Sequence, residues 1–242
     1  PWVTNFAGGG GVHINTRCES SLPGLYAAGD NSGGPVLGTY SVNGVNISYA
    51  YLSGCIAGTN AGQYARSLRE TRWDKASLNR QVYGKINEFT TCLDRTEGWR
   101  PAQIVHAIQE ILIPWSVTYI RNEQRLVKAI GAVQQLRKEQ IPLMKAVDLH
   151  ELARAHEATS LAILAELTLR SALFRQESRG FHYREDYPYT DNRNWLKWVM
   201  VKQEDHSPKI WAEVVPTPYI QPGETVAIPP GVRKKKDILD GN

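Results

Sequence analysis

Residues 22–30 read Leu-Pro-Gly-Leu-Tyr-Ala-Ala-Gly-Asp, and a loop rich in glycine, serine and asparagine separates them from a helix that opens near Asn46. We expect Leu25–Ala28 to form a short buried strand that leads into Gly29 and Asp30. An aspartate at this point can accept hydrogen bonds from a sugar or ribityl hydroxyl group. The glycines supply backbone conformations that other residues find strained, and the free N–H groups of the helix's first turn favour an electron-rich ligand edge. The stretch therefore predicts a cradle for a bound cofactor.

The helix predicted after this loop carries a row of small residues. Ala50, Gly54, Gly58 and Gly62 recur at four-residue spacing and therefore share one face. Each glycine costs about 1 kcal/mol relative to alanine in a helix interior. Such a row is useful where the helix must approach backbone or a flat ligand closely. Close helix–sheet packing and direct ligand contact both remain open.

Composition narrows the class of protein. The 242 residues are 42% hydrophobic and 21% charged, which suffices to bury a core. The net charge is only +4 and the basic run Arg233–Lys236 is short, which argues against a nucleic-acid partner. Three widely spaced cysteines predict neither a disulfide framework nor a metal site, and they favour a reducing, cytoplasmic compartment. No signal peptide or membrane-length apolar stretch is visible, and a start at Pro1 suggests a fragment of a longer protein.

The chain divides into three parts, which together predict an α+β fold. Residues 1–70 carry strand and glycine signals, with Gly8–Gly11 preceding a half-buried strand at Val12–Asn15. Residues 71–177 are predicted to be a helical bundle. Residues 178–242 are predicted to hold a loop, a small hairpin and an extended arm.

Four helices are expected in the second part, joined by short connections that favour an antiparallel bundle. Apolar residues recur at helical spacing in Val82, Ile86 and Phe89 and again from Ile104 to Leu112. The third helix is expected at Val117–Leu136. The fourth follows the acidic capping box Asp148–Glu151 and continues through Leu161, Leu164, Leu167, Leu169 and Leu173. We interpret His106, His150 and His156 on these helices as surface or hydrogen-bonded groups rather than ligands.

The third part begins with a loop-like run that holds two arginines, a histidine and two carboxylates within residues 178–188. Trp198–Val201 and Ile210–Val215 flank a polar turn at Glu204–Pro208 and predict a β-hairpin. The prolines and glycines after Pro216 predict an arm that is ordered only where it docks.

Two sequence runs carry a family resemblance. Residues 177–188 read Glu-Ser-Arg-Gly-Phe-His-Tyr-Arg-Glu-Asp-Tyr-Pro, and residues 194–197 read Asn-Trp-Leu-Lys. With the Gly-Leu-Tyr-Ala-Ala-Gly-Asp run at 24–30, this order resembles the C-terminal portion of a flavoprotein family. The family comprises the flavoprotein subunits of succinate dehydrogenase and fumarate reductase, aspartate oxidase and adenylylsulfate reductase. The resemblance covers essentially residues 1 to about 215.

The resemblance implies that residues 1–70 are the last segment of an FAD-binding domain and that the bundle is the family's C-terminal helical domain. By analogy, Gly29 and Asp30 lie at the cofactor, with the Asp30 carboxylate bonding the ribityl chain. The backbone at Val45, Asn46, Ile47 and Ser48 is then expected to face the flavin pyrimidine edge. A helix N-terminus there stabilises negative charge on the reduced flavin.

This chain departs from the family pattern in two places. Members that act on dicarboxylates carry a histidine before the Gly-Gly and a His-Gly-Ala-Asn-Arg run before the flavin helix, whose arginine clamps a substrate carboxylate. Here residues 5–9 lack the histidine and residues 38–43 lack the arginine, so we expect a substrate other than a simple dicarboxylate. Tyr40, Ser41 and Asn43 can serve such a substrate or act only as loop hydrogen-bonders, and Tyr40 is retained as a weak catalytic candidate.

The second departure is the lack of a Gly-x-Gly-x-x-Gly run after a strand. In the family, the ADP half of FAD and the substrate-capping domain lie N-terminal to the segment matched here. We therefore expect this chain to need an N-terminal FAD-binding and capping portion, supplied by the same gene or by a separate chain.

Arg179, His182 and Arg184 are the remaining catalytic candidates. We favour a structural role, in which Arg179 and Arg184 pair with Glu185, Asp186 or backbone and pin the C-terminal region against the FAD domain. A basic-aromatic face that docks an iron–sulfur partner is a third interpretation, and any membrane association would come through partner subunits.

Two functions from different classes follow. The first is an FAD-dependent oxidoreductase that transfers two electrons between substrate and flavin. The second is a non-catalytic helical-bundle interaction module that binds no flavin on its own.

Overall fold

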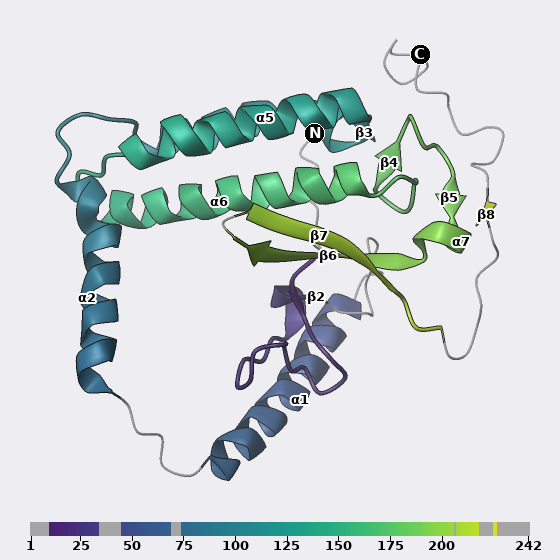
Figure 1. The fold of residues 1–242 in the computed structure, drawn as a ribbon, viewed down its shortest axis with the longest axis horizontal. Coiled ribbons are helices and arrows are strands. Elements are labelled where there is room, and N and C mark those ends of the chain that lie inside the picture. Colours follow the sequence, from purple (N-terminus) through teal and green to yellow (C-terminus); the bar gives the residue numbers. More distant parts are fainter. Residues whose placement is uncertain (1–9, 34–44, 69–73, 206, 218–224, 227–242) are drawn as a thin grey trace. The chain divides into compact units, whose positions relative to one another are not determined.

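The computed structural model describes residues 10–33, 45–68, 74–205, 207–217 and 225–226. It divides the chain into two compact units, Pro1–Lys75 and Ala76–Asn242. Figure 1 shows the elements of each unit, coloured along the sequence. Tyr40, Ser41 and Asn43, the departures at residues 5–9 and 38–43, and the basic run Arg233–Lys236 lie outside the described residues.

The first unit is built on one long helix. Strands β1 (Val12–His13) and β2 (Ser32–Gly33) pair in parallel, and the 3₁₀ turn η1 (Gly29–Asn31) leads into β2. Helix α1 (Val45–Ser67) begins where the sequence predicted a helix start. The small core of this unit consists of Ile14, Cys18 and Ala57, with partly buried neighbours that include Tyr26 and Ala28.

The predicted strand at Leu25–Ala28 is wrong. Only a single antiparallel bridge joins Tyr26 to Glu19, and Leu25 is exposed. The segment is instead the returning arm of a tight loop, in which the Ser20 N–H donates to the Leu25 carbonyl and the Ala27 N–H donates to the Cys18 carbonyl. Gly24, with a φ of +84°, allows that reversal.

The small-residue row of α1 does not pack as expected against any described residue. Ala50, Gly54 and Gly58 are exposed, and a Cβ added at Gly54, Gly58 or Gly62 would meet no atom within 4 Å. The helix packs through a neighbouring face, on which Ser53 and Ala57 are buried. Neither close sheet packing nor ligand contact explains the row within the part of the chain that is described.

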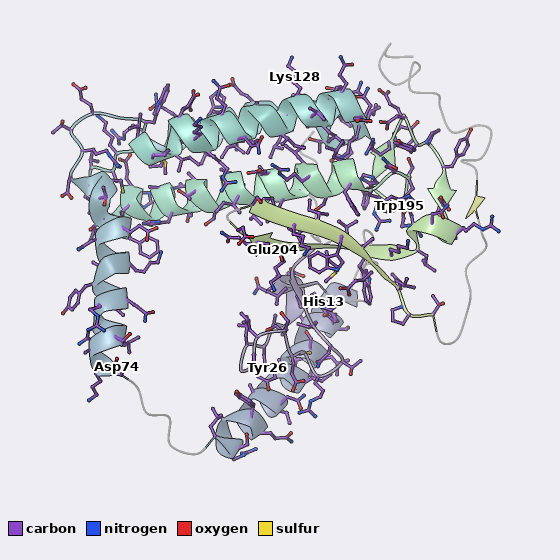
Figure 2. All side chains as sticks on the ribbon, viewed as in Figure 1. His13, Tyr26, Asp74, Lys128, Trp195 and Glu204 are labelled. Atoms are coloured by element: carbon purple, nitrogen blue, oxygen red, sulfur yellow. The ribbon has the colours of Figure 1, made fainter. Side chains whose placement is uncertain are left out.

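The second unit begins with a series of helices. They are α2 (Lys75–Thr90), η2 (Thr91–Leu93), α3 (Pro101–Leu112), α4 (Trp115–Thr118), α5 (Glu123–Glu139), η3 (Ile141–Leu143) and α6 (Leu149–Phe174), with strand β3 (Ile120–Arg121) before α5. Helices α5 and α6 run antiparallel side by side (Figure 1), and α3 packs against both. Lys128, labelled in Figure 2, lies on the face of α5 turned away from α6.

The core of this unit comes from α3, α5 and α6. Its most deeply buried members include Ile104, Ile108, Leu126 and Val133. The face that α6 contributes is made mostly of alanines, namely Ala155, Ala158, Ala162, Ala165 and Ala172, with Leu169. Leu164, which the sequence placed in the apolar stripe, is 59% exposed. Short side chains at the contact allow the helices to approach closely.

The predicted four-helix bundle is wrong in two respects. Helix α2 has no buried residue, and Val82, Ile86 and Phe89 are each more than 40% exposed, so three helices form the core. The helix expected at Val117–Leu136 is interrupted by β3. The interruption follows from Asn122, which adopts an extended conformation and caps α5 by accepting the Arg125 N–H at 2.9 Å. The cap predicted at Asp148 is confirmed, since its side chain accepts the Glu151 N–H at 2.8 Å.

The end of the chain returns to the bundle. Strand β4 (Tyr183–Arg184) pairs in parallel with β3, and β5 (Thr190–Asp191) pairs antiparallel with β8 (Thr225–Val226). After α7 (Asn192–Trp195), strands β6 (Lys197–Glu204) and β7 (Ser207–Val214) form the predicted hairpin and pack along α6 (Figure 1).

None of the described helices combines the length and apolar character needed to cross a membrane. Among the same residues, no group of three histidine, cysteine or acidic side chains is arranged to hold a metal ion.

Candidate functional site

The Gly29–Asp30 turn is held against α1 by a chain of hydroxyl groups. The Gly29 N–H donates to Ser53 Oγ at 2.9 Å, and Ser32 Oγ donates to the Gly29 carbonyl at 2.7 Å. Ser32 Oγ also lies 2.8 Å from Tyr49 Oη. Gly29 is buried with a φ of +59°, and a Cβ there would lie 3.4 Å from the Ala50 Cβ. Both its conformation and its contact with the helix therefore favour glycine.

The acceptor predicted for the cofactor is available. Asp30 is exposed, and within the described residues its carboxylate has no hydrogen-bond partner. Helix α1 begins at Val45, so the N–H groups of Val45, Asn46, Ile47 and Ser48 belong to its first turn. Ile47 and Ser48 are exposed, while the side chains of Val45 and Asn46 are outside the described set. A free carboxylate and a helix amino end are the acceptor and donor types that a ribityl chain and a pyrimidine edge require, so these residues fit FAD.

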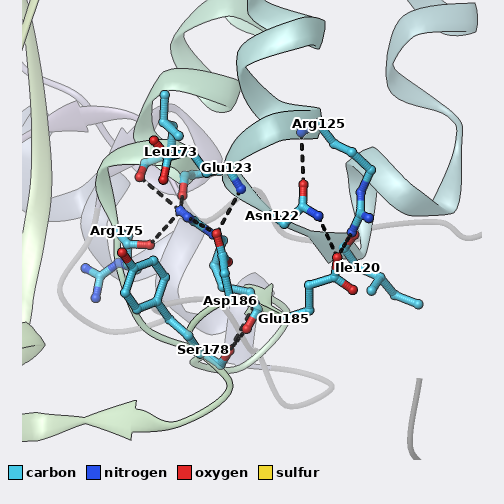
Figure 3. Close-up of polar contacts among 12 residues, drawn as sticks. Ile120, Asn122, Glu123, Arg125, Leu173, Arg175, Ser178, Glu185 and Asp186 are labelled. Atoms are coloured by element: carbon cyan, nitrogen blue, oxygen red, sulfur yellow. Dashed lines mark hydrogen bonds and ion pairs between the residues drawn. The ribbon is translucent and has the colours of Figure 1, made fainter. Parts of the chain in front are cut away.

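A second polar site joins two helix ends in the other unit, and Figure 3 shows its contacts. The Arg184 side chain is only 1% exposed. Its Nη1 donates to the carbonyls of Ala172 and Leu173, both at 2.9 Å, at the end of α6. Its other edge makes a two-point ion pair with Asp186, with both distances 2.7 Å.

Asp186 completes this link at the start of the other helix. It accepts the Glu123 N–H, the first of α5, at 2.9 Å. The cation thus lies at the carbonyl end of α6 and the anion at the amide end of α5, which matches both helix dipoles. Burial raises the pKa of Asp186, but the hydrogen bonds from Arg184 and the Glu123 N–H outweigh it, and the net pKa is lowered.

Glu177 organises the neighbouring part of the cluster. It is fully buried and accepts hydrogen bonds from Arg175, from Arg179 Nε at 2.8 Å and from the Asp191 N–H at 2.9 Å. Arg175 also donates to the Trp195 carbonyl at 3.0 Å and lies over the Trp195 ring, which is labelled in Figure 2. One carboxylate therefore ties the end of α6 to β5 and α7.

His182 is neutral in this cluster. Its Nε2 lies 3.2 Å from the Arg175 carbonyl, which assigns the proton to Nε2, and its Nδ1 lies 3.4 Å from Arg121 Nη1. Burial, reinforced by the Arg121 charge, lowers the pKa of His182 to about 4. The imidazole has little basicity to offer a reaction near neutral pH.

The structure thus brings Arg179, His182 and Arg184 together, as the sequence suggested, but each is committed to internal contacts. Arg184 pairs with Asp186 as predicted, whereas Arg179 pairs with Glu177 and with Asn192 Oδ1 at 2.7 Å. These contacts fasten the C-terminal region to α5 and α6. They support the structural interpretation of the three residues over the catalytic one.

Sequence reasoning missed several organising residues. Glu166 is 2% exposed and joins α5 to α6 through ion pairs with Arg137 and Arg170. Glu185 accepts from Asn122 Nδ2 at 2.6 Å and pairs with Arg125 at 2.7 Å. Of these, only Asn122 gave a usable signal, because an asparagine directly before an acidic helix start is a common N-cap.

Comparison with known proteins agrees with the resemblance. The family described as fumarate reductase flavoprotein C-term matches residues 108–234. An uncharacterised FAD-dependent oxidoreductase of Methanocaldococcus jannaschii is 30% identical over 206 residues, which cover 84% of this chain and 35% of that protein. One component of the fumarate reductase (CoM/CoB) of Methanothermobacter marburgensis is 31% identical over 203 residues, covering 81% and 35%. The chain therefore spans about a third of the length of the curated relatives it matches.

A solved structure shows the same fold. The chain superposes on the FrdA chain of E. coli quinol fumarate reductase with a TM-score of 0.77 at 21% identity, covering 88% of this chain and 37% of the other. Because the family match alone takes in more than half of the residues, this chain belongs to the fumarate reductase flavoprotein C-terminal family.

Proposed function

We propose that this chain is the C-terminal part of an FAD-dependent oxidoreductase of the fumarate reductase and succinate dehydrogenase type. Family membership over residues 108–234 carries the proposal. The Gly29–Asp30 turn supports it independently, since its serine contacts fix the turn against α1 while leaving the Asp30 carboxylate free among the described residues. The flavin, when bound, supplies the two-electron chemistry.

The chain's own residues have defined tasks in this proposal. Asp30 accepts hydrogen bonds from the ribityl hydroxyls and thereby orients the cofactor. The first-turn amides of α1, at residues 45–48, face the pyrimidine edge and favour the negative charge that the reduced cofactor carries. The Arg184–Asp186 and Glu177 clusters hold the C-terminal region in place and take no part in the chemistry.

The remaining parts of the cofactor site come from elsewhere. Without a Gly-x-Gly-x-x-Gly run, this segment has no cradle for the ADP half of FAD. We propose that an N-terminal FAD-binding and capping portion completes the site and that an iron–sulfur subunit exchanges electrons with it. The relatives are named as subunits, which agrees with such an assembly.

The substrate is proposed to differ from succinate and fumarate. Residues 5–9 offer no histidine and residues 38–43 no arginine, so two carboxylates would lack their main partners. Tyr40, Ser41 and Asn43 suit a neutral or differently charged substrate.

The experiment measures FAD content in the purified protein that carries this segment together with its FAD-binding portion. Asp30→Ala is expected to lower the bound FAD at limiting cofactor by about tenfold, the effect of about 1.4 kcal/mol. Asp94→Ala is the matched control, because Asp94 is also an exposed aspartate but lies in the other unit.

Equal FAD content in the two variants would contradict the role of Asp30. A wild-type protein that stays colourless with its FAD-binding portion present would overturn the oxidoreductase proposal and favour the interaction module.

A further inference from the structure

Arg121 stands apart from the other arginines of its cluster. Arg125 pairs with Glu185, Arg184 pairs with Asp186, and both Arg175 and Arg179 pair with Glu177. Within the described residues, Arg121 makes no ion pair with any carboxylate. It lies on β3, beside Arg184 of β4 in the parallel register. A guanidinium so close to another cation has every electrostatic reason to take an anion.

The Arg121 side chain is fixed through one nitrogen only. Nη1 donates to the Phe181 carbonyl at 3.3 Å and lies 3.4 Å from His182 Nδ1. Since the His182 proton is on Nε2, Nδ1 is an acceptor and takes the second Nη1 hydrogen. The Nε–H and both Nη2 hydrogens of Arg121 have no partner among the residues that the structure describes. This unused edge is the one that meets both oxygens of a carboxylate.

The surroundings make an unpaired edge costly. The Arg121 side chain is half-buried, and burial together with the Arg184 charge lowers the pKa of Arg121. A desolvated charge without a counter-ion is unfavourable, so such groups are normally paired. The anchoring at Nη1 also reduces the conformational entropy that the side chain would lose on binding.

We propose that Arg121 is an anion site that takes a carboxylate group in a two-point contact through its Nε–H and Nη2. Neutral His182 is a positioning residue, because it holds the guanidinium without adding repulsion toward the anion. The carboxylate comes either from a small molecule or from an acidic side chain of another protein segment. The inference does not depend on flavin binding.

The test follows the Nε–H resonance of Arg121 by NMR in the full chain while acetate is added at constant ionic strength. A saturable shift with acetate and none with chloride is expected for a free carboxylate ligand. If a second copy supplies the carboxylate, the resonance instead shifts with protein concentration, and Arg121→Gln removes the associated self-association. A resonance that follows neither acetate nor protein concentration overturns the proposal.

Two substitutions separate the fork from the charge. Arg121→Lys keeps the charge but loses the two-point geometry, and we expect at least about tenfold weaker acetate binding, followed through the Glu185 N–H, which donates to the Arg121 carbonyl. Arg66→Gln, which removes an exposed arginine in the other unit, is the control and should leave acetate binding unchanged. Equal affinity in Arg121→Lys and wild type would contradict recognition by the fork.

Discussion

His182 shows how a charged neighbourhood fixes the state of a single residue. Three arginines, Arg121, Arg175 and Arg184, disfavour a positive imidazole, and burial disfavours it more strongly. The Arg175 carbonyl accepts from Nε2 and favours the charged form, but it does not compensate. The histidine is therefore a neutral link between Arg175 and Arg121.

The pH dependence of stability follows from this neutral state. The pKa of His182 is about 4 in the folded protein and about 6.5 when unfolded, so the unfolded state binds more protons between these values. Stability is fully present above about pH 6.5 and falls toward pH 4 by about 1.4 kcal/mol per pH unit. Between about pH 7.5 and pH 5, wild type should lose about 2 kcal/mol more than His182→Gln does.

Urea unfolding of both proteins at the two pH values measures this difference. All other titrating groups are shared, so their contributions cancel in the comparison. Parallel stability curves for the two proteins would show that His182 is not held neutral.

At the scale of elements, the end of α6 and the start of α5 share one ion pair. Arg184 satisfies two carbonyls that α6 cannot satisfy itself, and Asp186 satisfies the first N–H of α5. The β3–β4 pairing holds the two strands that carry this contact in register. Capping, dipole and tertiary connection therefore depend on the same two side chains.

Arg184→Lys tests this arrangement. An ammonium group has three hydrogens on one atom and cannot serve Asp186 and the α6 carbonyls in the same planar geometry. We expect a loss of roughly 3 kcal/mol in unfolding free energy, the range found when one partner of a buried pair is removed. Denaturant unfolding measures it, with Arg154→Lys as an exposed control expected to change by less than about 0.5 kcal/mol. A loss as small as that of the control would contradict the capping role.

Elements with local signals were predictable. The cap at Asp148 and the hairpin around Glu204–Pro208 depend on nearby residues, and both are confirmed. The strand at Leu25–Ala28 was wrong because its backbone bonds are made within a loop, which apolar content alone does not reveal. The break before α5 was missed because apolar spacing continues across Asn122, while the cap and Glu185, a partner distant in sequence, decide the local conformation.

At the scale of the whole molecule, the family was predictable because its motif encodes a buried polar network. Residues 177–188 carry the charges that make the cluster, so their order is specific. The partners within the cluster were only partly predictable, since Arg179 could pair with any nearby acid and chose Glu177 over Glu185. The free edge of Arg121 had no sequence signal, because it depends on which acids the neighbouring arginines take.

Glu177 is the point at which α6, β5 and α7 meet, so its neutralisation should loosen several elements at once. Glu177→Gln leaves Arg175 and Arg179 without their counter-ion and presents an amide donor to them. We expect a local opening easier by about 2 kcal/mol, which corresponds to about 30-fold faster hydrogen exchange.

The affected amides are defined by the network. The Asp191 N–H donates to Glu177, and the Val215 N–H donates to the Leu196 carbonyl just after α7, so both should exchange faster. Amides in the middle of α5 should keep their wild-type rates, because Glu166 and the apolar core hold that helix. Glu110→Gln, an exposed change on α3, is the control. Acceleration spread evenly over α5 and the hairpin would mean that Glu177 supports the global fold rather than this junction.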